Sequence, residues 1–170
     1  MKSPLLRHTA TYGLYIGLAL IVLSLISNLL FDQQNKTFNL LSNWLIPILG
    51  ICWATIQYRD KEKGGFISYG DSVGYGTLLA LFYGIVTAVF TVILATIIDP
   101  EYIGRTLELT RIAFEESGLP EQRIDYLMAV AEQFSRPGWM FIGGVIGSVV
   151  LGVIISLIAS IFIKRNKPMF

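Results

Sequence analysis

Four long apolar stretches, separated by polar segments, dominate the pattern of hydrophobic and polar positions along the chain. A helix needs about 20 apolar residues to cross a bilayer core of about 30 Å. The first two stretches contain no charged residue, and the last two are long enough to span with some tilt. We therefore predict an all-α integral membrane four-helix bundle in a single membrane domain, with spans at about residues 12–31, 40–58, 73–98 and 139–163.

The segment between the last two stretches, residues 99–138, is amphipathic rather than apolar. Asp99 and Pro100 fit the cap and the first position of a helix, and Gly118 fits its carboxyl-terminal stop. Pro120 then opens a second helix, in which apolar residues recur at helical spacing. We predict a hairpin of two amphipathic helices outside the membrane.

The apolar faces of this hairpin have two interpretations. They pack on each other or on the outer membrane surface, or they dock a protein partner or lipid. A helix pair of this size has little core of its own, so we expect it to pack against another surface. The candidate docking residues are Ile124, Leu127, Met128 and Phe134.

Small residues recur every four positions in the third and fourth predicted spans. Lipid is as apolar as leucine, so membrane helices associate through close backbone packing, which small residues permit. The pattern predicts a tight helix interface, either inside one bundle or between two copies of the chain in a homo-oligomer. The candidate packing residues are Gly76, Ala80 and Gly84, together with Gly144, Ser148, Gly152 and Ser156.

Composition and charge agree with a membrane protein and orient it. Only 15% of residues are charged and the mean hydropathy is +0.61, whereas soluble domains carry about 25% charged residues. The side with both termini holds eight basic and three acidic residues, and the other side holds five basic and nine acidic. Because a basic excess marks the cytoplasmic face, we expect both termini in the cytoplasm and the hairpin outside it.

Candidate chemistry is sparse. An ionisable residue inside a membrane is a functional hypothesis by default, and none lies in the middle of a predicted span. His8, the sole histidine, is expected at the membrane surface with no nearby ligand for a metal. No nucleophile constellation, phosphate loop or basic patch interleaved with aromatics is present. We expect no metal, no other cofactor and no nucleic-acid partner.

One unusual segment precedes the third span. Gly64 and Gly65 permit a turn with positive φ, and Ser68 can cap the helix that follows. The alternative is functional, with Ser68 and Asp71 forming a polar mouth on the cytoplasmic side.

Several motifs occur in an order that resembles an uncharacterised bacterial membrane family common in the Bacteroidetes, known as domain of unknown function 4199. They are residues 64–70, Ile98–Asp99–Pro100, Glu121–Gln122, Phe134 with Pro137, residues 152–158, and Lys164–Arg165. The resemblance covers nearly the whole chain. It implies a four-span protein of the bacterial inner membrane and supplies no activity, cofactor or catalytic residue.

Three functional hypotheses follow. The first is a structural or interaction protein that docks a partner or lipid through its outer hairpin. The second is a small oligomeric transporter or channel, suggested by the glycine-rich fourth span and the polar mouth. The third and least favoured is a membrane enzyme, for which only the carboxylates of the hairpin, such as Glu121 and Asp125, offer a cluster, and a solvated helix face explains them equally well.

Overall fold

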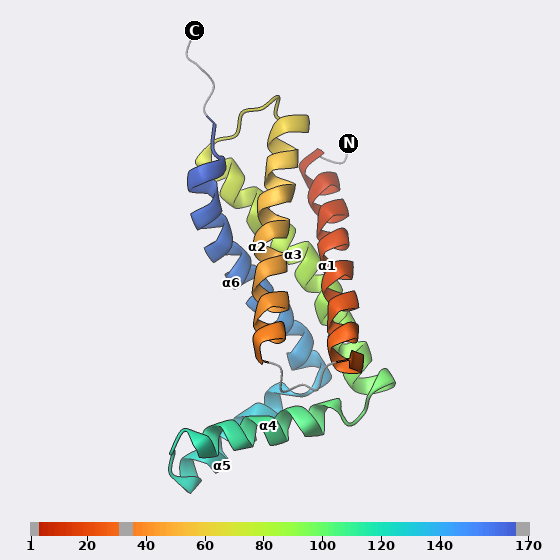
Figure 1. Cartoon of the computed structure of the whole chain (residues 1–170), viewed down its shortest axis with the longest axis vertical. Helices are drawn as coiled ribbons and strands as arrows, with labels where there is room; N and C mark the ends of the chain where they lie inside the picture. Colours follow the sequence, from red (N-terminus) through yellow and green to blue (C-terminus); the bar gives the residue numbers. More distant parts are fainter. Residues whose placement is uncertain (1–3, 31–35, 166–170) are drawn as a thin grey trace. The chain divides into compact units, whose positions relative to one another are not determined.

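The computed structural model describes residues 4–30 and 36–165, with side chains over residues 4–26 and 44–165. Every regular element in these ranges is helical, which confirms the all-α fold class (Figure 1). A π-helical segment, η1, directly continues α3. The elements are α1 (Pro4–Leu30), α2 (Lys36–Lys61), α3 (Tyr69–Ile93), η1 (Leu94–Ile98), α4 (Tyr102–Glu116), α5 (Glu121–Phe134) and α6 (Pro137–Ile163).

Three stretches of the described chain are helical, long and apolar enough to cross a membrane. They are Pro4–Ile26, Tyr69–Ile98 and Pro137–Ile163. Lipid offers no hydrogen-bond partner to the backbone, so a helix, which pairs its own N–H and C=O groups, is the structure that such stretches adopt. α2 is not in this set, and it carries Arg59 and Lys61 in its last turn.

The chain divides into two compact units. The first contains residues 1–87 and 145–170, and the second contains residues 88–144. The first unit therefore holds α1, α2 and most of α3 and α6. The second holds the end of α3, η1, the hairpin of α4 and α5, and the start of α6.

The first unit is a bundle in which α1, α2, α3 and α6 lie side by side (Figure 1). Its core takes apolar side chains from all four helices, among them Ile16, Ile51, Leu79 and Ile155. Large apolar side chains also cover the outside of the bundle, which suits a lipid environment better than water. Examples are Leu14, Leu18, Trp53, Ile154 and Ile158.

Small residues bring α3 and α6 of the first unit into close contact. A Cβ atom added at Gly84 would lie 2.7 Å from Ser148 Cβ. One added at Gly152 would collide with Ala80, and one at Gly76 would collide with Ser156. Each step of four residues forward along α3 is matched by four residues back along α6, so the two helices are antiparallel and in register. In the second unit, a Cβ atom added at Gly144 would lie 3.2 Å from Ala88 Cβ.

Glycines also set the distance between α1 and α3. A Cβ atom added at Gly13 would lie 2.6 Å from Phe82 Cβ and 3.2 Å from the Tyr83 backbone nitrogen. One added at Gly17 would lie 2.8 Å from Val86 Cγ1. α1 and α3 therefore approach more closely than a side chain at Gly13 or Gly17 would allow.

The turns use glycine where the sequence predicts it. Gly64 and Gly65 have φ values of +65° and +87°, which confirms the predicted turn before α3. Gly118 has a φ of +72° and follows the last turn of α4, which confirms it as the stop of that helix. Left-handed backbone of this kind costs glycine little and other residues more.

The prediction that Asp99 caps the first hairpin helix is wrong, because that helix begins later than expected. η1 extends α3 to Ile98, the predicted end of the third span, and the Asp99 N–H closes the π turn by donating to the Leu94 carbonyl at 2.8 Å. α4 begins only at Tyr102. The Asp99 carboxylate instead pairs with Arg105.

We predict that Gly152→Ala destabilises the protein by about 1–3 kcal/mol, the usual cost of overpacking, because the new methyl group collides with Ala80. Gly147→Ala is the matched control on the same helix, since a Cβ atom there meets nothing within 4 Å. Unfolding of both variants in mixed detergent micelles, followed by tryptophan fluorescence, measures the difference. Equal stability of the two variants would contradict the prediction.

Candidate functional site

Buried polar side chains of the first unit gather at one end of the bundle. They come from the first turns of α1 and α3 and the last turns of α2 and α6. The same end carries the charged segment that connects α2 to α3. The set comprises His8, Thr9, Thr55, Ser72, Ser156 and Ser160.

His8 lies at the centre of this polar end, and the expectation of an exposed surface side chain is wrong. Only 9% of the residue is exposed. Its Nδ1 lies 2.7 Å from the hydroxyl oxygen of Tyr75. α1 begins at Pro4, well before the apolar run, so His8 belongs to a helical turn that packs inside the bundle.

Three tyrosines enclose the His8 imidazole. The ring stacks on Tyr12 with a centroid distance of 4.2 Å and meets the Tyr58 ring edge-on at 5.3 Å. Tyr58 and Tyr75 stack on each other at 4.5 Å. We call His8, Tyr12, Tyr58 and Tyr75 the aromatic cluster. It joins α1 to α3 through one buried hydrogen bond and joins both to α2 through the ring contacts of Tyr58.

One ring nitrogen of the aromatic cluster makes no hydrogen bond to the described residues. His8 Nε2 is buried and has no hydrogen-bond partner among the described residues. A ring nitrogen of this kind can hold or pass a proton. No group of three His, Cys, Asp or Glu side chains in the described part of the chain is placed to hold a metal ion. The cluster therefore offers proton chemistry and a helix-joining contact.

Sequence reasoning missed this cluster, although part of its signal was present. Tyr12 follows His8 by four residues, which places both on one face of a helix. Tyr58 and Tyr75 read equally well as residues of the membrane interface. Only the packing of α2 and α3 against α1 brings them to the histidine.

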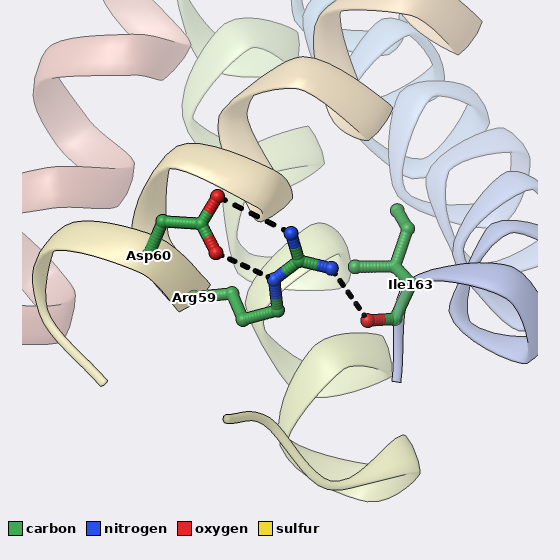
Figure 2. Close-up of polar contacts among 3 residues, drawn as sticks. All are labelled: Arg59, Asp60 and Ile163. Atoms are coloured by element: carbon green, nitrogen blue, oxygen red, sulfur yellow. Dashed lines mark hydrogen bonds and ion pairs between the residues drawn. The ribbon is translucent and has the colours of Figure 1, made fainter. Parts of the chain in front are cut away.

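A second set of contacts closes the same end of the bundle (Figure 2). The Arg59 guanidinium donates from Nε to Asp60 Oδ1 at 2.7 Å and from Nη2 to Oδ2 at 3.2 Å. Its Nη1 donates to the Ile163 carbonyl at 3.1 Å. That carbonyl is among the last four of α6, which have no partner inside the helix. Arg59 therefore caps α6 from α2.

The backbone beyond α6 pairs with the segment before α3. The Ile67 N–H donates to the Arg165 carbonyl at 2.9 Å, and the Arg165 N–H donates to the Ile67 carbonyl at 3.0 Å. This antiparallel bridge and the Arg59 cap form what we call the clasp, made of Arg59, Ile67, Ile163 and Arg165. One turn further in, Ser160 Oγ donates to Ser72 Oγ at 2.7 Å.

The two residues of the predicted polar mouth have local partners. Ser68 Oγ accepts the Asp71 N–H at 3.1 Å, which confirms that Ser68 caps α3. The Asp71 carboxylate lies 3.7 Å from Lys63 Nζ. Both residues are exposed, so they form a helix cap with a surface ion pair.

The predicted docking residues divide by exposure. Ile124 is 5% exposed and lies inside the hairpin, and Leu127 and Met128 are half-buried. Phe134 is 54% exposed, and its ring meets Trp139 at 5.5 Å. Of the four, Phe134 presents the most apolar surface outward.

We predict that Tyr75→Phe destabilises the protein by about 1–3 kcal/mol, because it leaves His8 Nδ1 buried without a partner. Tyr15→Phe is the control, since Tyr15 is exposed. Replacing both partners in His8→Phe/Tyr75→Phe should recover part of the loss, because no orphaned polar atom remains. Thermal unfolding followed by circular dichroism tests this order. A double variant less stable than Tyr75→Phe would refute it.

We predict that Asp60 titrates at lower pH than an ordinary aspartate. The hydrogen bonds from Arg59 hold the pKa of the Asp60 carboxyl below its ordinary value. A depressed folded pKa means that the pair stabilises the fold above the ordinary carboxyl pKa, and that this contribution is lost as pH falls through the folded value. Carbon NMR of labelled aspartate should show the Asp60 midpoint rising in Arg59→Gln. Lys63→Gln, which removes the partner of Asp71, should leave that midpoint unchanged.

Comparison with known proteins places the chain in a family. No curated protein and no solved structure matches it. One family model matches residues 11–165, a range that contains both the aromatic residues at positions 12, 58 and 75 and the whole clasp. The chain therefore belongs to the family described as Protein of unknown function (DUF4199).

Proposed function

We propose that this protein is a membrane-embedded accessory protein that binds a partner protein through the α4–α5 hairpin. The observation that carries the proposal is the exposure of the hairpin. α4 has no buried residue, and in α5 only Ile124 is buried. A helix pair that buries so little apolar surface gains stability by covering it with another molecule.

Exposed apolar side chains occur on both helices of the hairpin. Leu109 and Ile112 are exposed on α4, three residues apart and so on one face of the helix. On α5, Tyr126 is 69% exposed and Phe134 is also exposed. Aromatic anchors among apolar neighbours are typical of protein interfaces.

Charge favours a protein over an anionic lipid surface. Residues 99–138 carry eight acidic and four basic side chains. Such an excess is repelled by anionic headgroups and attracts a partner whose surface carries Lys or Arg. Arg111 is engaged inside the hairpin, 3.1 Å from Glu115 and 3.9 Å from Asp125.

We further propose that α2 is a fourth span, that the membrane is the bacterial inner membrane, and that both termini are cytoplasmic. Ile51 and Ala54 of α2 are buried in the core of the first unit, which supports the insertion of α2 beside the three apolar helices. The basic excess on the side of the termini supports the orientation.

Site-specific photo-crosslinking in intact cells tests the hairpin. A benzophenone side chain at Tyr126 should cross-link one protein, and Leu109→Ser/Ile112→Ser should reduce that product at least tenfold. The control position is Phe162, which is 82% exposed on the first unit and should cross-link lipid. Lipid adducts alone at Tyr126, or a protein product unaffected by the double variant, would reject the proposal.

A small transporter or channel is the second candidate, and His8 is the observation that favours it. A buried imidazole with an unpartnered nitrogen is an ionisable group inside the bundle, which the sequence did not predict. Solute flux into liposomes that exceeds protein-free controls and is abolished by His8→Phe would move this candidate ahead of the first.

A further inference from the structure

The clasp end of the first unit holds more positive charge than its local contacts use. Its described basic residues are Arg7, Arg59, Lys61, Lys63, Lys164 and Arg165, and its described acidic residues are Asp60, Glu62 and Asp71. Arg59 pairs with Asp60, and Lys63 pairs with Asp71. The other four cations are exposed and form no ion pair with any described residue. Glu62 and, through its electrostatic interaction with Arg165, Asp60 oppose part of this charge.

The clasp holds two of these cations on fixed backbone. Both hydrogen bonds of the bridge to Ile67 use the backbone of Arg165, so the bridge does not involve its guanidinium. The Lys164 N–H donates to the Ser160 carbonyl at 3.1 Å, which extends the order of α6 to that residue. An ordered cation binds an anion with less loss of entropy than one on a mobile tail.

The clasp also covers groups that would repel an anion. The carboxyl end of a helix carries partial negative charge on its unpaired carbonyls. In α6, Arg59 covers the Ile163 carbonyl and the Lys164 N–H covers that of Ser160. Two of the last four carbonyls of α6 are therefore already paired.

The apolar side chains just before these cations set their depth. Ile161 and Phe162 are exposed at the end of an apolar helix long enough to cross a membrane. Side chains of this kind belong among acyl chains, so Lys164 and Arg165, which follow directly, lie at the level of the headgroups. Arg offers a planar fork of donors that matches a phosphate, and Lys adds a point charge.

We propose that the clasp end is a binding site for an anionic phospholipid headgroup, with Lys164 and Arg165 as its phosphate ligands. This goes beyond the orientation that a basic excess confers, because it requires selective retention of one lipid class. It is independent of the hairpin, which belongs to the other unit.

Native mass spectrometry of the full chain in a mild detergent tests the site. Phosphatidylglycerol and phosphatidylcholine are added in equal amounts, and the bound copies of each are counted. We expect preferential retention of phosphatidylglycerol, and a loss of roughly tenfold in Lys164→Gln/Arg165→Gln, on the basis that each cation near an anionic headgroup contributes severalfold. The bridge survives this change because it uses backbone atoms only.

The matched control is Arg123→Gln/Arg136→Gln, which removes two exposed cations from the second unit and should leave retention unchanged. A second variant, Lys164→Gln, keeps the Arg165 side chain and should also lower retention. Equal retention of the two lipids, or equal losses in the control and the test variants, would overturn the proposal. So would displacement of phosphatidylglycerol by inorganic phosphate alone, since that result identifies a site for the free anion.

Discussion

The close approach of α3 and α6 is the constraint on which the rest of the first unit depends. In a lipid environment, apolar surface gains nothing by leaving lipid for protein, so contact between helices has to come from dispersion and backbone proximity. Gly76, Gly84 and Gly152 allow that proximity because each stands where a side chain would collide with the facing helix. On the facing helix, Ser148 and Ser156 stand opposite two of these glycines, where their small side chains permit the same approach.

The register of this contact determines what meets at the end of the bundle. With Gly76 against Ser156, the next step brings Ser72 to Ser160, and their hydroxyls bond. One turn beyond, α6 ends where the Arg59 guanidinium and the Ile67 backbone can reach it. A slip of one turn between α3 and α6 would separate all of these pairs together. The clasp thus forms only in this register, and its contacts in turn stabilise the register.

The fold was largely predictable from the sequence, and the site was not. The length of the apolar stretches, the helix stop at Gly118 and the helix cap at Ser68 depend only on nearby residues. Such features can be predicted from each segment by itself. Burial of His8 depends on how far α1 extends beyond its apolar run and on which residues of α2 and α3 face it, so no local pattern encodes it. The predicted cap at Asp99 was wrong because α4 begins only at Tyr102, with Glu101 at the cap position.

The clasp also has a consequence for the order of events during synthesis. Arg59 and the Ile163 carbonyl that it caps are 104 positions apart. Until α6 has been synthesised, Arg59 lacks the Ile163 carbonyl that it caps, and Ile67 lacks the Arg165 backbone with which it pairs. Contacts that close so long a stretch of chain form late. An early assembly of α1, α2 and α3 therefore exposes the face of α3 that carries Gly76 and Gly84. α6 covers this face last, and the clasp then holds α6 in place.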